Sequence, residues 1–221
     1  MSRVLNILVE GPTEKEFVNN LIYPHLLALN ISNVRPITIE TSPGYKGGDV
    51  RYEARYKSNI VNLLRGKEDM IVTSLIDFYK LRSDFPKYEE AKKIADVEAR
   101  IEFLEDACFT DIADNRFIPY IQLHEFEGLL FADTKGFDLF TDLPAASKKE
   151  LIGIVNSYQN PELINEGVNT APSVRLKRLI QPYNKPLYGN IIALENGFDS
   201  ILQKCPRFKA WIDTLILRMK A

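Results

Sequence analysis

The sequence predicts an α/β fold, a mostly parallel four-stranded sheet flanked by helices and followed by a helical C-terminal region. Two observations predict it. In the first part of the chain, β-favouring apolar runs alternate with helical periodicities, which is typical of a parallel sheet. From residue 145 onward the periodicity is helical only. We therefore expect an α/β domain over residues 1–134 and a helical region over residues 135–221 that packs on it.

The first strand and the turn that follows it organise the chain. The apolar run Val4–Val9 stops at Glu10, and Gly11-Pro12 then bends the backbone into a helix. Thr13 and Glu16 have the spacing of a capping box. Glu10 is thus expected at the carboxyl end of a buried strand beside a helix N-terminus, where open α/β sheets bind ligands. The alternative is a solvated Glu in an ordinary strand-to-helix turn.

The next elements lead to a glycine-rich loop. A helix is predicted over residues 13–29, with Pro24 kinking it or ending its first segment, and a strand over residues 34–39. The loop Ser42–Asp49 contains three glycines and Lys46 but lacks the P-loop pattern. We interpret it as a flexible loop at the active site, with Lys46 as a phosphate contact. A second helix is expected over residues 51–64.

A second carboxylate follows the next strand. The nearly continuous apolar run over residues 70–76 is typical of a strand covered on both faces, and it ends in Asp77. The polar, proline-containing stretch over residues 81–93 is interpreted as an insertion or lid. A helix is predicted over residues 94–108.

The fourth predicted strand, over residues 117–123, ends in His124, Glu125 and Glu127. We expect Glu125 to face the site and Glu127 to stabilise the start of the next helix. His124 is either a hydrogen-bonded residue of the strand end or a metal ligand. If this strand lies on the same side of the sheet as the Asp77 strand, Glu10, Asp77 and Glu125 or Glu127 converge on one Mg²⁺, a cation that takes oxygen ligands.

The C-terminal part is basic. Residues 171–221 contain nine Lys or Arg and three Asp or Glu, although the whole chain has a net charge of −2. This balance excludes nucleic-acid binding by bulk electrostatics and leaves a local patch or a metal. Arg175 and Lys185 are the cations that we expect near a phosphate, and an ordinary solvated basic face is the alternative. Residues 208–216 have the spacing of an amphipathic helix that packs on the body.

Length and composition indicate the class of protein and its cellular location. The 221 residues are 45% hydrophobic, as expected of a globular protein with a full core. The two cysteines, Cys108 and Cys205, have no metal-ligand spacing and are expected to be reduced and buried. The sequence has neither a signal-peptide pattern nor an apolar run long enough for a bilayer, so we expect a cytoplasmic protein without membrane association.

Several motifs resemble a known family. The segment VEGPTEKEF at residues 9–17 resembles the first motif of the TOPRIM domain, the small α/β domain of topoisomerases, primases and OLD-family nucleases. The chain as a whole is similar to an uncharacterised, TOPRIM-like family of bacterial proteins that is usually encoded beside an AAA or ABC-type ATPase. The segments that carry this similarity are YKGGD at 45–49, SLIDFYKL at 74–81, FIPYIQLHEFEGLLF at 117–131, PELIN at 161–165, APSVRL at 171–176 and PRFKAWIDTL at 206–215.

The resemblance implies a TOPRIM-type nuclease that depends on Mg²⁺ or Mn²⁺, cleaves DNA or RNA, and works with a partner ATPase in a defence or DNA-processing system. Glu10 would be a metal ligand or a general base, Asp77 a metal ligand, and Glu125 and Glu127 candidates to complete the ligand shell. TOPRIM domains carry an Asp-x-Asp pair where this chain has Asp77 and Tyr79, a departure from the family's pattern. The alternative function is a non-catalytic TOPRIM-like module that docks on the ATPase.

Overall fold

The computed structural model describes residues 3–42, 45–46, 50–79, 81–164, 167 and 169–221, with the backbone alone for residues 40–42 and 45–46. Its centre is a sheet in the order β2-β1-β5-β6, and β7 also pairs with β5. All of these pairs are parallel, as the sequence predicts. The strands are β1 (Val4–Val9), β2 (Val34–Thr38), β5 (Met70–Asp77), β6 (Phe117–Ile118) and β7 (Ile121–Gln122). A separate antiparallel pair consists of β3 (Glu40–Ser42) and β4 (Tyr45–Lys46).

The last position in the sheet holds two short strands, β6 and β7, where the sequence predicts one. Pro119 between them has no N–H for the ladder. The Ser74 hydroxyl on β5 replaces the missing ladder bonds, because it donates to the Tyr120 carbonyl at 2.9 Å and accepts from the Tyr120 N–H at 3.1 Å. The edge therefore stays attached to β5 across the break.

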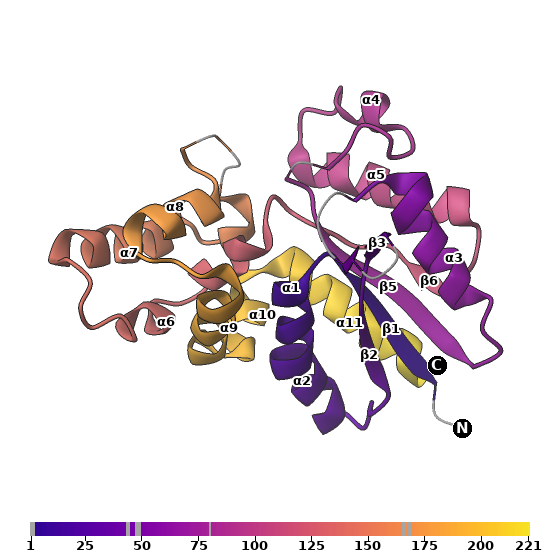
Figure 1. Cartoon of the computed structure of the whole chain (residues 1–221), viewed down its shortest axis with the longest axis horizontal. Coiled ribbons are helices and arrows are strands. Elements are labelled where there is room, and N and C mark those ends of the chain that lie inside the picture. Colours follow the sequence, from indigo (N-terminus) through magenta and orange to yellow (C-terminus); the bar gives the residue numbers. More distant parts are fainter. Residues whose placement is uncertain (1–2, 43–44, 47–49, 80, 165–166, 168) are drawn as a thin grey trace.

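Helices cover both faces of the sheet (Figure 1). In β1, Leu5, Ile7 and Val9 belong to the core on one face, and Val4 and Leu8 belong to the core on the other, as the period of two along a strand requires. The first core is shared with α1 (Pro12–Phe17), α2 (Tyr23–Ala28) and the C-terminal helices. The second is shared with the π-helical segment Tyr52–Lys57, α3 (Ser58–Leu64), α4 (Tyr88–Ala91) and α5 (Val97–Ile112).

The start of the first helix differs from the prediction. The helix begins at Pro12 with Gly11 as its N-cap and no side-chain capping bond, so the predicted capping box of Thr13 and Glu16 is wrong. Thr13 is buried inside the first turn. A π-helical turn, Val18–Ile22, connects α1 to α2 just before Pro24. Since Pro24 has no N–H to donate, this turn lets the helix pass the proline.

Other expected features are present with shifted bounds. Helix α5 begins later than predicted because Asp96 caps it by accepting from the Ala99 N–H at 2.8 Å. Within the segment 81–93, interpreted as an insertion, Phe85 is buried and contacts the rings of Tyr52 and Tyr56, which ties this segment to the core. Both cysteines are free and buried, as expected. Within the described residues, no helix is long and apolar enough to cross a membrane.

The chain after residue 134 is helical in its described part and forms a lobe beside the sheet (Figure 1). Its helices are α6 (Lys135–Asp138), α7 (Ala145–Ser157), a 3-10 turn at Pro161–Leu163, α8 (Pro172–Leu179), α9 (Lys185–Asn196), α10 (Phe198–Lys204) and α11 (Pro206–Lys220). Helix α11 returns from the lobe to the sheet. There Trp211 stacks on Tyr120, with ring centroids 4.4 Å apart, and donates to the Thr73 hydroxyl at 2.9 Å.

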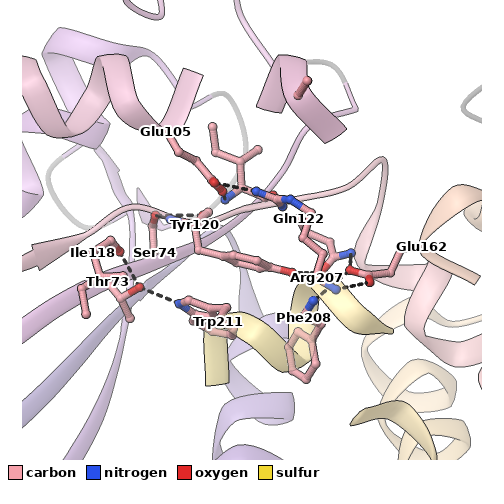
Figure 2. A network of polar contacts seen from close by, with 12 residues as sticks. Thr73, Ser74, Glu105, Ile118, Tyr120, Gln122, Glu162, Arg207, Phe208 and Trp211 are labelled. Atoms are coloured by element: carbon pink, nitrogen blue, oxygen red, sulfur yellow. Dashed lines mark hydrogen bonds and ion pairs between the residues drawn. The ribbon is translucent and has the colours of Figure 1, made fainter. Parts of the chain in front are cut away.

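A buried polar network fixes the start of α11 (Figure 2). Glu162, fully buried, accepts from the backbone N–H groups of Arg207 and Phe208 at 2.9 and 3.1 Å. The Arg207 guanidinium in turn lies 2.5 Å from a carboxylate oxygen of Glu105 and donates to the Ile121 carbonyl at 2.7 Å. These bonds satisfy a helix N-terminus that would otherwise be buried with unpaired donors.

Candidate active site

Three carboxylates meet at the carboxyl edge of the sheet. Val9 pairs with Leu75 in the parallel register, which places Glu10 and Asp77 at the ends of neighbouring strands. Glu127 lies in the 3-10 helix Phe126–Phe131 that follows β7. Asp77 fixes the start of this 3-10 helix next to the end of β5, because its Oδ1 accepts from the Phe126 N–H at 2.8 Å.

One ammonium group sits among these carboxylates. Lys185 Nζ lies 3.1 Å from Glu127 Oε2 and 3.4 Å from Glu14 Oε1. Glu14 is in the first turn of α1, and Lys185 is the first residue of α9. The two helices are held together by Asn190, whose side chain donates to the Thr13 carbonyl at 3.2 Å. A cluster of opposite charges is thus built from segments far apart in the sequence.

The cluster opens into a cavity of about 550 Å³. Four acidic side chains and three cations line it, namely Glu10, Asp77, Glu125, Glu127, Arg82, Lys177 and Lys185. Tyr79 also lines it, at the position where TOPRIM domains have their second Asp. The cavity therefore combines hard oxygen donors with groups that attract an anion.

Burial perturbs the acids of the cluster. It raises the pKa of Glu10 to about 7, with repulsion by Glu14 acting in the same direction and the Lys185 ammonium opposing it. Burial likewise raises the pKa of Asp77 and of Glu127, again opposed by Lys185. Burial alone would lower the pKa of Lys185, but Asp77, Glu127 and Glu14 raise it, so Lys185 stays charged. A carboxyl whose pKa is close to neutrality is suited to proton transfer.

This shift gives a prediction for stability. Because the pKa of Glu10 is higher in the folded state, the protonated side chain contributes stability at low pH, and this contribution is lost as the pH rises through about 7. From about pH 5.5 to 8.5, we expect the free energy of unfolding of the wild type to decrease by about 2 kcal/mol more than that of Glu10→Gln. Denaturant titrations at the two pH values measure this difference. Glu16→Gln, at an exposed position on α1, is the control and should follow the wild type; equal pH dependence of all three proteins would contradict the prediction.

The two glutamates after β7, Glu125 and Glu127, both line the cavity, but they have different partners. Glu125 stabilises a helix start, since its two oxygens accept from the backbone N–H and the hydroxyl of Ser173 at 2.9 and 2.8 Å in the first turn of α8. Glu127 is the one that joins the Lys185 cluster. The partners differ because the chain continues after Glu125 in a 3-10 helix, which has Glu127 in its first turn, rather than as an extended strand.

The remaining predicted residues fall in different places. Arg175 is not among the residues that line the cavity, and its Nε donates to the Thr170 carbonyl at 2.7 Å. Lys177, on another side of α8, lines the cavity instead. His124 is buried with a positive φ, and its carbonyl accepts from the Tyr79 N–H at 2.7 Å. The side chain of Lys46 and the glycines of its loop lie outside the described residues.

Sequence reasoning missed several site residues, among them Glu14, Arg82, Ser173 and Lys177. A signal for Glu14 exists. It lies four residues after Glu10, and a sharp strand-to-helix turn points the first helical turn back towards the strand end. Gly11 permits this close approach, since a Cβ there would lie 3.3 Å from Glu14 Oε2. No comparable signal marks Lys177 or Ser173, whose positions depend on how α8 docks.

Comparison with known proteins places the chain in a family. A family model described as "Domain of unknown function (DUF4276)" matches residues 9–216. The chain belongs to the DUF4276 family. No curated protein matches this DUF4276 chain.

Solved structures resemble it in fold. The C-terminal region of the Burkholderia pseudomallei OLD protein matches with a TM-score of 0.52 at 16% identity, over 97% of this DUF4276 chain and 96% of that structure. The C-terminal region of the Xanthomonas campestris pv. campestris OLD protein matches with a TM-score of 0.47 at 17% identity, over 99% and 95%. The Burkholderia structure confirms the expected TOPRIM-like α/β fold, and the family match confirms the expected uncharacterised family.

Proposed function

We propose that this chain is a nuclease of TOPRIM type that hydrolyses phosphodiester bonds of DNA or RNA with the help of Mg²⁺ or Mn²⁺. The observation that carries the proposal is the convergence of Glu10, Asp77 and Glu127 in a cavity that Lys177, Lys185 and Arg82 also line. Clustered carboxylates and nearby cations are what metal-assisted phosphodiester hydrolysis requires.

The donor set suits a hard divalent cation. All three acids offer carboxylate oxygens, and the side chain of Glu127, which is 1% exposed, has the Lys185 ammonium 3.1 Å from its Oε2. The described residues contain no group of three or more His, Cys, Asp or Glu already arranged around one point as a metal site. Mg²⁺ nevertheless needs only one or two protein carboxylates, because it keeps several of its waters.

Each side chain has a role in the proposal. Glu10 and Asp77 would hold the ion, which when bound would polarise the phosphate and activate a water. Glu127 would complete the ligand set, and Glu10, with its pKa near 7, is also suited to accept a proton. Glu125, which also lines the cavity, would hold the first turn of α8 and thereby position Lys177.

Partners are proposed from the resemblance. Structural likeness to the C-terminal region of an OLD protein supports a nuclease-type TOPRIM fold. On the family resemblance we propose that the chain works with an AAA or ABC-type ATPase in phage defence or DNA processing. A second function, that of a non-catalytic module that docks on this ATPase, is favoured by Tyr79, because it leaves the strand end without a second Asp.

Metal-dependent stabilisation and cleavage by the purified chain test the proposal. At a hundredfold excess over its Kd, a bound cation stabilises a protein by about 2.7 kcal/mol, so Mn²⁺ should raise the melting temperature of the wild type. In the double variant Glu10→Gln and Asp77→Asn, Mn²⁺ should no longer raise the melting temperature. The double variant should also no longer cleave single-stranded DNA, double-stranded DNA or RNA. An equal rise in both proteins would contradict the metal site. Mn²⁺ binding without cleavage, even with the ATPase present, would favour the docking module.

A further inference from the structure

Lys185 occupies an unfavourable position for a cation. It is the first residue of α9, a helix of 12 residues, and a helix N-terminus carries a partial positive charge. The helix start is capped by Asn184, whose Oδ1 accepts from the Leu187 N–H at 3.2 Å. The packing of α9 on α1 therefore holds the ammonium where the helix itself disfavours it, and neighbouring carboxylates have to offset that cost.

The carboxylates that offset it are both buried. The side chains of Glu127 and Glu14 are 1% and 6% exposed, whereas that of Lys185 is 33% exposed. The Lys185 ammonium, 3.1 Å from Glu127 Oε2, is the cation that offsets the charge of this carboxylate. Buried carboxylates of this kind are costly without a counter-charge.

We infer that Lys185 is the resident counter-ion of the acidic cluster, and that a divalent cation has to displace its ammonium to bind Glu127 and its neighbours. This inference rests on the proposed function. The ammonium and the metal ion would use the same carboxylate oxygens. Two cations bound to the same carboxylates repel each other strongly in a partly buried site. The half-open position of Lys185 at the cavity gives its four-carbon side chain room to move towards solvent.

Displacement would link metal binding to substrate binding. A Lys185 ammonium released from Glu127 and Glu14 no longer has its charge cancelled, and it lines the same cavity as Lys177 and Arg82. The cavity wall thus gains a free cation only once the metal is bound. Without metal, the ammonium stays paired with Glu127 and Glu14 and attracts a phosphate weakly.

Direct Mn²⁺ titration tests the inference without relying on cleavage. Free Mn²⁺ is measured by electron paramagnetic resonance for the wild type, Lys185→Met, Lys185→Arg and Lys177→Met. We expect Lys185→Met to bind Mn²⁺ about tenfold more tightly or better, because it lacks the competing charge. Lys185→Arg keeps the charge and should bind no more tightly than the wild type. Lys177 lines the same cavity but pairs with neither Glu14 nor Glu127, so Lys177→Met should change the affinity less than threefold, roughly.

The outcomes separate this inference from the proposed function. If the wild type and Lys185→Met bind Mn²⁺ equally, or if Lys185→Met binds less tightly, the inference is overturned while the metal site stands. If neither binds, the metal site fails as well. Should Lys185→Met be unfolded without metal, its refolded fraction is followed against Mn²⁺ concentration. Refolding at concentrations below the Kd of the wild type supports displacement, and failure to refold at saturating Mn²⁺ overturns it.

Discussion

Arg207→Met is expected to lower the free energy of unfolding by about 3–5 kcal/mol. The substitution keeps much of the side-chain volume but leaves the Glu105 carboxylate, whose side chain is 14% exposed, without its cation and the Ile121 carbonyl without its donor. It also removes the guanidinium that lies over the Tyr120 ring, 5.2 Å from its centroid. Urea denaturation followed by circular dichroism measures the loss.

Two further measurements separate lost charge pairing from lost packing. Adding Glu105→Gln to Arg207→Met removes the unpaired charge and should recover at least about 1 kcal/mol. Burial already raises the pKa of Glu105, and loss of the Arg207 cation raises it further in the folded state. The stability deficit of Arg207→Met should therefore be smaller at low pH and grow as the pH rises. A deficit that is independent of pH and unchanged by Glu105→Gln would point to packing alone.

Asp77→Asn should reduce cleavage by about a thousandfold or more while leaving the fold intact. The amide oxygen of Asn can still accept from the Phe126 N–H, which Asp77 Oδ1 now does at 2.8 Å, so the free energy of unfolding should change by no more than about 1 kcal/mol. What is lost is the negative charge that would hold the cation. Initial cleavage rates and denaturation curves on the same preparations measure both effects.

Asp84→Asn is the matched control. Asp84 also accepts a backbone hydrogen bond, from the Tyr52 N–H at 3.1 Å, but it is not among the residues that line the cavity. Its substitution should leave cleavage at the wild-type rate. A similar loss of cleavage in both variants would indicate a general effect of the amide rather than a role for Asp77 in the site.

The parts of the site that follow regular strands can be predicted from the sequence. Apolar runs locate β1 and β5, and in a parallel sheet their carboxyl ends must lie side by side, which brings Glu10 and Asp77 together. Prediction fails where the chain leaves regular structure. The pairing of Glu127 with Lys185 depends on the 3-10 helix that follows Glu125, which hydrophobic periodicity does not reveal. The attachment of the edge to β5 across the break between β6 and β7 depends on the hydroxyl of Ser74, which periodicity does not reveal either.

The contributions of the helical region are harder still to predict, because they depend on docking. Lys185 reaches Glu127 because α9 packs on α1, whereas Arg175 donates to the carbonyl of Thr170, five residues earlier in the chain. Both are basic residues near the starts of helices that have a proline in their first turn. Only the tertiary arrangement distinguishes the residue at the cavity from the other.

The stacking of Trp211 on Tyr120 provides an intrinsic fluorescence probe for the position of α11. Trp211 is the sole tryptophan of the chain, so any change in tryptophan emission arises at the contact of α11 with the β5–β6 edge. At 4% exposure it should emit as a buried indole, and detachment of α11 should shift the emission to longer wavelength. Comparing that signal with backbone circular dichroism during denaturation would show whether the C-terminal helix leaves the sheet before the rest unfolds or together with it.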